Sequence, residues 1–160
     1  DSTDCVLEHL LPEYSTHQGI MGLGDNVCCV RQHTTKHAQK FFLYYFEKFP
    51  AHQNHFPAYK GVKAADLPAV EMWETHPSEV VTLLLHVVDR SGNAGLLKAE
   101  AEQLAKMPQH KALKVQEFKD IFTALRGYLE ETLGPGYAKE AWEKASTDIC
   151  AAIGAAMAAM

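Results

Sequence analysis

The chain has 160 residues, enough for one domain with a substantial hydrophobic core. It is 47% hydrophobic and 22% charged, as is ordinary for a globular protein. The net charge of −5, without a cluster of Lys and Arg, argues against a nucleic-acid-binding surface. No apolar run reaches the roughly 20 residues that a membrane-spanning helix needs.

Helical periodicity dominates the sequence, and no convincing run alternates with the period of two that is typical of a β-strand. The turn-rich residues 1–22 predict an N-terminal extension before a domain over 23–160. Helices are expected over 36–49, 78–90, 94–107, 115–133 and 137–158, with Pro50, Pro108 and Gly134 ending three of them. We therefore expect an all-α domain of six to eight helices.

The two C-terminal segments show the clearest amphipathic pattern. One stripe of 115–133 carries Val115, Phe118, Ile121, Phe122, Leu125, Tyr128 and Leu129. The segment 78–90, by contrast, is apolar over most of its circumference. A helix with that pattern is expected in the middle of the fold.

The four cysteines match no metal-binding spacing. A bridge between Cys5 and Cys150 and a set of four free thiols both fit the sequence. Cytoplasmic and extracellular locations therefore both remain compatible with it.

Histidine is the more informative residue type, with nine in the chain, because imidazole is a versatile ligand for metals and haem. His76 lies in "WETHPSEVV", directly before a proline. Pro77 removes a backbone donor and disfavours helical dihedrals at His76, so the helix either starts there or is kinked. Thr75 is a candidate for its N-cap. His110 lies in "MPQHKAL", where Pro108 is expected to end one helical turn and begin another.

The order of these motifs resembles the globin family. "YYFEKFP" resembles its aromatic second helix, and "HQNHFPAYKG" the following corner with its phenylalanine. "ETHPSEVV" and "MPQHKAL" resemble the segments with the distal and proximal histidines, and two long closing helices follow. The resemblance covers about 23–160 and is nearest to invertebrate globins, including nematode and annelid dehaloperoxidase-like types.

The resemblance implies a globin fold around haem b. It implies that His110 is the proximal iron ligand, with its other ring nitrogen donating to a backbone carbonyl. His76 would be the distal histidine. The remaining pocket residues implied are Phe56 on the porphyrin face, Phe42 on the distal wall, Val80 above the iron, and Phe118, Ile121 and Phe122 at the back.

The other histidines have simpler interpretations. His86, inside "LLLHVV", is expected to be a satisfied core or interface residue rather than a ligand. His33, His37, His52 and His55 are expected to be solvated residues of loops or helix ends.

Several functions remain open at this point. The first is reversible binding of dioxygen or another diatomic gas, for transport or storage. The second is a bis-histidine globin, in which His76 also ligates iron, for electron transfer or gas sensing. The third is a dehaloperoxidase-like enzyme with Phe42, Tyr45, Phe56 and Tyr59 admitting a phenol. A helical interaction domain without haem is the remaining alternative, and a homo-oligomer is possible by analogy.

Overall fold

The computed structural model describes residues 21–160, and within them it contains six α-helices joined by short 3₁₀ helices and loops. The α-helices are α2 (Leu23–Gln32), α3 (Thr34–Lys48), α4 (His76–Arg90), α5 (Ala94–Lys106), α6 (Val115–Leu133) and α7 (Lys139–Ala158). The 3₁₀ helices are η1 (Pro50–His55), η2 (Ala64–Ala69), η3 (Glu71–Glu74), η4 (Pro108–His110) and η5 (Gly134–Gly136). The all-α prediction is confirmed.

Residues 1–20 lie outside the described part of the chain. The expected N-terminal extension therefore stays a prediction, as does any pairing of Cys5. Each of the five expected helices is present, with ends that differ by a few residues from the sequence-based bounds. Helix α2 was not expected as a separate element.

Proline and glycine set the helix boundaries. Pro50 and Pro108 each occupy the first position of a 3₁₀ helix, where the missing N–H costs no hydrogen bond. Gly134 ends α6 with a φ of 54°, a left-handed conformation that glycine adopts without steric penalty.

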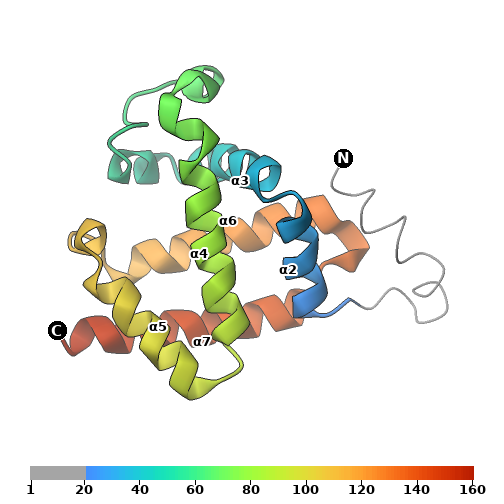
Figure 1. Ribbon diagram of the computed structural model, residues 1–160, viewed down its shortest axis with the longest axis vertical. Helices are drawn as coiled ribbons and strands as arrows, with labels where there is room; N and C mark the ends of the chain where they lie inside the picture. Colours follow the sequence, from blue (N-terminus) through green and yellow to red (C-terminus); the bar gives the residue numbers. More distant parts are fainter. Residues whose placement is uncertain (1–20) are drawn as a thin grey trace.

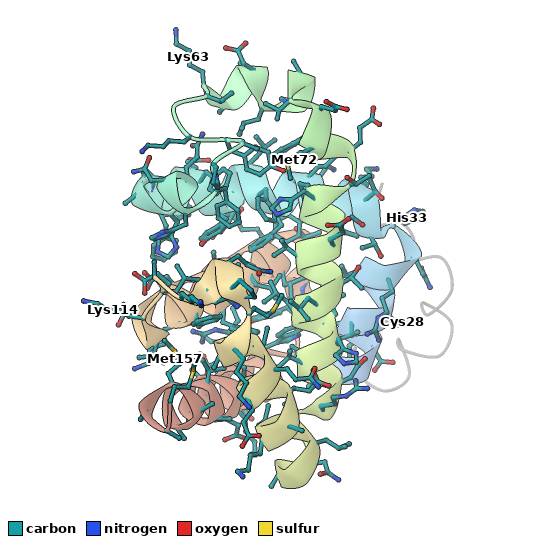
Figure 2. The ribbon with its side chains drawn as sticks, turned by 60° about the vertical axis from the view of Figure 1, so that its left-hand side comes forward. Cys28, His33, Lys63, Met72, Lys114 and Met157 are labelled. Atoms are coloured by element: carbon teal, nitrogen blue, oxygen red, sulfur yellow. The ribbon has the colours of Figure 1, made fainter. Side chains whose placement is uncertain are left out.

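The long helices pack around one hydrophobic core. Figure 1 shows α4 crossing α6 and α7, which lie alongside one another, while α3 packs against α4 and α6 and α5 against α7. The centre is filled by large, fully buried side chains, among them Phe41, Phe42, Phe122 and Trp142. Exposed side chains such as Lys63 and Lys114 point outward from this core (Figure 2).

A buried asparagine fixes α2 to the start of α7. The Asn26 side chain is fully buried and donates to the carbonyl of Gly136 at 2.9 Å. Its oxygen accepts from the backbone N–H of Ala138 at 2.8 Å and from Nε1 of Trp142 at 3.0 Å. One side chain thus satisfies three polar groups that would otherwise be buried without partners.

Within the described residues, none of the helices is both long and apolar enough to cross a bilayer.

Candidate functional site

A cavity of about 510 Å³ lies between α4, α6 and the segments η1 and η4. Its volume falls within the range of about 300–1,000 Å³ that is usual for small-molecule and cofactor sites. Most of its wall is apolar. The polar side chains on it include four histidines, together with Glu79, Gln109, Glu117 and two tyrosines; the histidines are His52, His55, His76 and His110. Met72 lies at its rim and is 46% exposed.

His110 lies on the cavity wall at the end of η4. Its Nδ1 is 2.8 Å from the carbonyl oxygen of Leu104, near the end of α5. A carbonyl can only accept, so Nδ1 carries a proton, and in the neutral form of the ring Nε2 keeps its lone pair. The ring also packs edge-on against Phe118, with centroids 5.4 Å apart. Pro108 begins η4 two residues earlier, as the sequence predicts, and so orients this loop.

His76 lies on the same cavity and is the first residue of α4. Pro77 occupies the first turn, where its missing N–H is not needed, so the helix starts late and is not kinked. Thr75 precedes the helix, but its side chain makes no capping hydrogen bond, so that expectation was wrong. Only its backbone carbonyl accepts, from the N–H of Glu79.

Tyr59 forms a hydrogen bond to the His76 ring and packs against it. The Tyr59 hydroxyl is 3.0 Å from Nδ1 of His76, and the two ring centroids are 5.6 Å apart. Burial, with the Glu79 carboxylate nearby, raises the pKa of Tyr59 to about 12. Burial also lowers the pKa of His76, against the opposing effect of Glu79. The pair is therefore a neutral phenol and a neutral imidazole at pH 7.

The direction of this hydrogen bond follows from the remaining partners. Tyr59 is 1% exposed, and its hydroxyl has no other hydrogen-bond partner among residues 21–160. If Nδ1 were the donor, the phenolic O–H would be buried without an acceptor. An unsatisfied buried O–H costs more free energy than an oxygen lone pair that accepts no hydrogen bond. Tyr59 therefore donates, and His76 carries its proton on Nε2.

Most of the residues that the sequence singled out lie on this cavity. Five apolar side chains among them line it: Phe56, Val80, Phe118, Ile121 and Phe122. Phe42 is fully buried and lies one layer behind the wall, packed edge-on against Phe56, Tyr59 and His76. It supports the wall without lining it.

His52 was expected to be solvated, and that expectation was wrong. It is 7% exposed, because η1 folds it back against α3 and α6. Its Nδ1 is 2.6 Å from the Tyr45 hydroxyl, and its Nε2 is 2.9 Å from Oδ2 of Asp120. Gln116 donates to the other oxygen of that carboxylate at 2.9 Å.

His37 is also buried, at 1% exposure, contrary to expectation. Its Nδ1 lies 2.8 Å from the Tyr128 hydroxyl, and its Nε2 has no partner among the described residues. Burial, aided by His33, Lys40 and Lys36, lowers the pKa of His37 to about 4. His33 and His55 are exposed, as expected.

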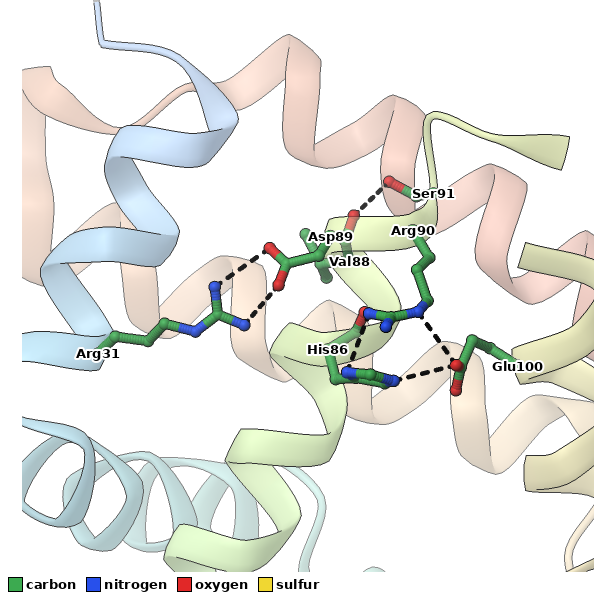
Figure 3. Close-up of polar contacts among 7 residues, drawn as sticks. All are labelled: Arg31, His86, Val88, Asp89, Arg90, Ser91 and Glu100. Carbon is green, nitrogen blue, oxygen red and sulfur yellow. Dashed lines mark hydrogen bonds and ion pairs between the residues drawn. The ribbon is translucent and has the colours of Figure 1, made fainter. Parts of the chain in front are cut away.

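His86 has hydrogen-bond partners, as predicted, but it lies at the surface and not in the core, since its side chain is 40% exposed. Its Nε2 lies 3.0 Å from the Glu100 carboxylate and its Nδ1 lies 2.9 Å from Arg90, while Arg31 pairs with Asp89 nearby (Figure 3). This network ties α4 to α5 and α2. It lies apart from the residues that line the cavity.

Several cavity residues have no signal in the sequence. Leu104, Met107, Leu113 and Ile153 complete the apolar wall from α5, the loop after it and α7. Tyr59 was expected only as an aromatic wall residue, and its bond to His76 depends on the fold of the segment between them. Such partners could be found only from a three-dimensional arrangement.

Comparisons with known proteins agree with the all-α fold. A model of the Globin family matches residues 39–153. A globin of Aplysia kurodai is 29% identical over 116 residues, which is 72% of this chain and 79% of that protein. A globin of Chironomus thummi thummi is 32% identical over 104 residues, 62% of this chain and 65% of that protein.

The fold also resembles a solved structure. The azide complex of ferric Aplysia limacina myoglobin superposes with a TM-score of 0.73 at 28% identity. The match covers 83% of this chain and 92% of the myoglobin.

Proposed function

The chain belongs to the globin family, and on that premise we propose that it binds haem b in the cavity and binds dioxygen there reversibly, for transport or storage. One observation carries the proposal. His110 and His76 line the same apolar cavity, and each has its Nδ1 engaged by a protein group, which leaves Nε2 for the interior.

The cavity suits a flat, mostly apolar cofactor. Its volume is about 510 Å³, and Phe56, Val80, Phe118 and Ile121 offer aromatic and branched surfaces to the faces of a ring system. The exposed end carries polar residues, His55 and Gln109, suited to the charged edge of a porphyrin. These features support haem as the occupant.

His110 is proposed as the proximal ligand. Its Nδ1–H donates to the Leu104 carbonyl, which fixes the ring orientation and increases the basicity of Nε2. A neutral imidazole with a free Nε2 lone pair is the usual protein ligand of globin iron. When bound, haem supplies the ferrous iron at which dioxygen coordinates.

His76 is proposed as the hydrogen-bond donor to dioxygen. Because Tyr59 occupies Nδ1, the N–H of His76 is on Nε2, the atom left for the cavity. A hydrogen bond to a polarised ligand is worth about 1–3 kcal/mol, which corresponds to an affinity effect of roughly 5- to 150-fold.

The same proton placement argues against the bis-histidine alternative. To ligate iron, Nε2 of His76 needs a lone pair, so the proton would have to move to Nδ1. The Tyr59 hydroxyl would then have to turn its own proton away from its hydrogen-bond partner. That cost favours an open sixth position on the iron.

The test is oxygenation of the haem-loaded, reduced protein followed by removal of the gas. We expect the absorption spectrum to change on oxygenation and to return fully, and His76→Leu to speed dioxygen dissociation by at least about fivefold. His86→Leu, a change in a histidine away from the cavity, is the matched control and should leave the rate unchanged. Oxidation without a stable oxygenated spectrum would contradict the proposal.

A further inference from the structure

The segment that brings Phe56 and Tyr59 to the cavity is a turn outside the helices. It runs from Phe56 to Val62, between η1 and η2, and Gly61 within it has a φ of 75°. Phe56 lines the cavity wall, and the Tyr59 hydroxyl lies 3.0 Å from Nδ1 of His76. The orientation of the His76 ring therefore depends on how firmly this turn is held.

Backbone hydrogen bonds within the turn set its local shape. The carbonyl of Phe56 accepts from the N–H of Tyr59 at 2.9 Å and from that of Lys60 at 3.1 Å. The carbonyl of Tyr59 accepts from the N–H of Val62 at 3.1 Å. Each of these bonds joins two residues of the turn, so none of them attaches the turn to a neighbouring element.

The half-buried side chain of Gln53 attaches the turn to η1. Its Nε2 lies 2.6 Å from the carbonyl oxygen of Tyr59 and 2.7 Å from that of Val62. A carbonyl only accepts, so the amide nitrogen faces both oxygens and donates one N–H to each. The backbone carbonyl of Gln53 also accepts from the N–H of Phe56 at 3.2 Å. One residue of η1 thus holds the turn at both its ends and at Tyr59.

The helix that carries Gln53 is itself anchored. The N–H of Phe49, the residue before η1, donates to the carbonyl of Tyr45 at 2.8 Å. His52, the neighbour of Gln53, is buried and bonded on its two ring nitrogens to Tyr45 and Asp120. Because η1 is fixed to α3 and α6 in this way, the carboxamide of Gln53 has a fixed origin from which to hold the turn.

We propose that Gln53 is a positioning residue for the ligand-binding cavity: its carboxamide fixes the backbone of Tyr59 and thereby places the Tyr59 hydroxyl at Nδ1 of His76. Gln53 is not among the residues that line the cavity, so it acts through Tyr59 and touches neither His76 nor a bound ligand. Its effect on dioxygen rests on the proposed function. Its effect on the proton position in the His76 ring does not.

Three substitutions separate hydrogen bonding by Gln53 from the space that it fills. Gln53→Met keeps the length of the side chain but donates no hydrogen bond, whereas Gln53→Lys supplies donors again through its ammonium group. Gln53→Glu has the shape of glutamine, but its carboxylate only accepts. Asn54→Leu is the matched control, because Asn54 is the next residue of the same 3₁₀ helix and is exposed.

The first measurement is the pair of ¹⁵N shifts of the His76 ring in the diamagnetic carbon monoxide complex of the haem-loaded protein. The unaltered protein should show a protonated Nε2 and an accepting Nδ1. In Gln53→Met we expect both shifts to move toward the average of the two tautomers, and in Gln53→Lys and Asn54→Leu to stay unchanged. Unchanged shifts in Gln53→Met, even with a lower free energy of unfolding in urea, would overturn the proposal.

The second measurement is the rate of dioxygen dissociation in a double-mutant cycle. Gln53→Met alone should speed dissociation roughly two- to threefold, less than the loss of the Tyr59 hydroxyl itself. Combined with Tyr59→Phe, it should add nothing to the effect of Tyr59→Phe, because a residue that acts through the hydroxyl has no effect once the hydroxyl is gone. Additive effects of the two substitutions would contradict the proposal.

The remaining outcomes also decide the proposal. If Gln53→Met does not fold, Gln53→Glu takes its place in both measurements with the same expected results. If the unaltered protein takes up no haem, the proposed function fails, and the His76 shifts of the protein as purified still test the role of Gln53. Reversible oxygenation with His76 shifts that no Gln53 variant changes defeats only this inference.

Discussion

The Tyr59 hydroxyl lies 3.0 Å from Nδ1 of His76, and this contact decides which nitrogen of His76 carries the proton. Tyr59 is in the turn after η1, seventeen residues before His76, and is buried under the start of α4. In the proposed distal role, His76 held in this way presents an N–H donor to the cavity. It does not present the lone pair that would bind iron.

Replacing Tyr59 by phenylalanine should weaken dioxygen binding without changing the cavity shape. The variant frees Nδ1 of His76, so the ring can turn and its proton can move between the two nitrogens. We expect dioxygen dissociation to be roughly fivefold faster, the equivalent of about 1 kcal/mol. Flash photolysis or stopped-flow displacement by carbon monoxide measures that rate.

The matched control is Tyr128→Phe, which breaks a tyrosine–histidine bond to His37 that is not part of the cavity. Its dissociation rate should equal that of the unaltered protein. Equal rates for Tyr59→Phe and the unaltered protein would show that Tyr59 does not position His76.

Removing the His110 side chain should abolish stable haem retention. In His110→Gly the carbonyl of Leu104 loses its donor and the cavity loses its only proposed proximal nitrogen. Free imidazole can occupy the vacated space and should restore the Soret band in a concentration-dependent way. His55→Gly, which removes an exposed rim imidazole, should retain haem without added imidazole; if both variants behave alike, His110 is not the ligand.

Asn26→Ala should be strongly destabilising although it is far from the cavity. The change leaves the Gly136 carbonyl, the Ala138 N–H and Nε1 of Trp142 without their partner. Each unsatisfied buried group costs about 1–3 kcal/mol. Because the surrounding structure can relax and partly satisfy these groups, we expect a total loss of about 3 kcal/mol. Urea unfolding checks this, with the exposed substitution Gln103→Ala as a control that should change stability little.

Acid should destabilise the fold through His37. Its pKa is lowered to about 4 in the folded protein, against an ordinary 6.5, so between these values the unfolded chain binds more protons. The free energy of unfolding therefore falls as the pH falls from about 6.5 to about 4. Above pH 6.5, His37 makes no pH-dependent contribution to it. The loss should be on the order of 2–3 kcal/mol.

The check is urea unfolding at several pH values for His37→Gln and for His33→Gln, whose residue is exposed. His37→Gln should flatten the pH dependence in this window, and His33→Gln should not. An unchanged slope in His37→Gln would assign the acid sensitivity to other groups.

Much of the fold could be predicted because its signals are local. Apolar periodicity located α3 to α7. The proline after His76 left two possibilities, a helix that starts at this residue or a kinked one, and the structure shows the start. Pro108 likewise indicated the break before His110. Helix α2 was not predicted, because its ten residues are too few and too mixed in polarity to show a clear helical periodicity.

The partners of the buried polar groups could not be predicted, because they are distant in sequence. His52 meets Asp120 across 68 positions, His37 meets Tyr128 across 91, and Asn26 meets Trp142 across 116. Each looks like a solvent-exposed polar residue when only its neighbours are considered. Burial in these cases follows from tertiary packing, which no local pattern encodes.

The most direct test of the central claim is the visible absorption spectrum of the haem-loaded protein, reduced with dithionite under nitrogen. One broad band in the green is predicted, since His110 is proposed to bind the iron and His76, protonated on Nε2, to leave the sixth position open. Two sharp bands that His76→Leu abolishes would contradict the account, because they would show that His76 is itself an iron ligand.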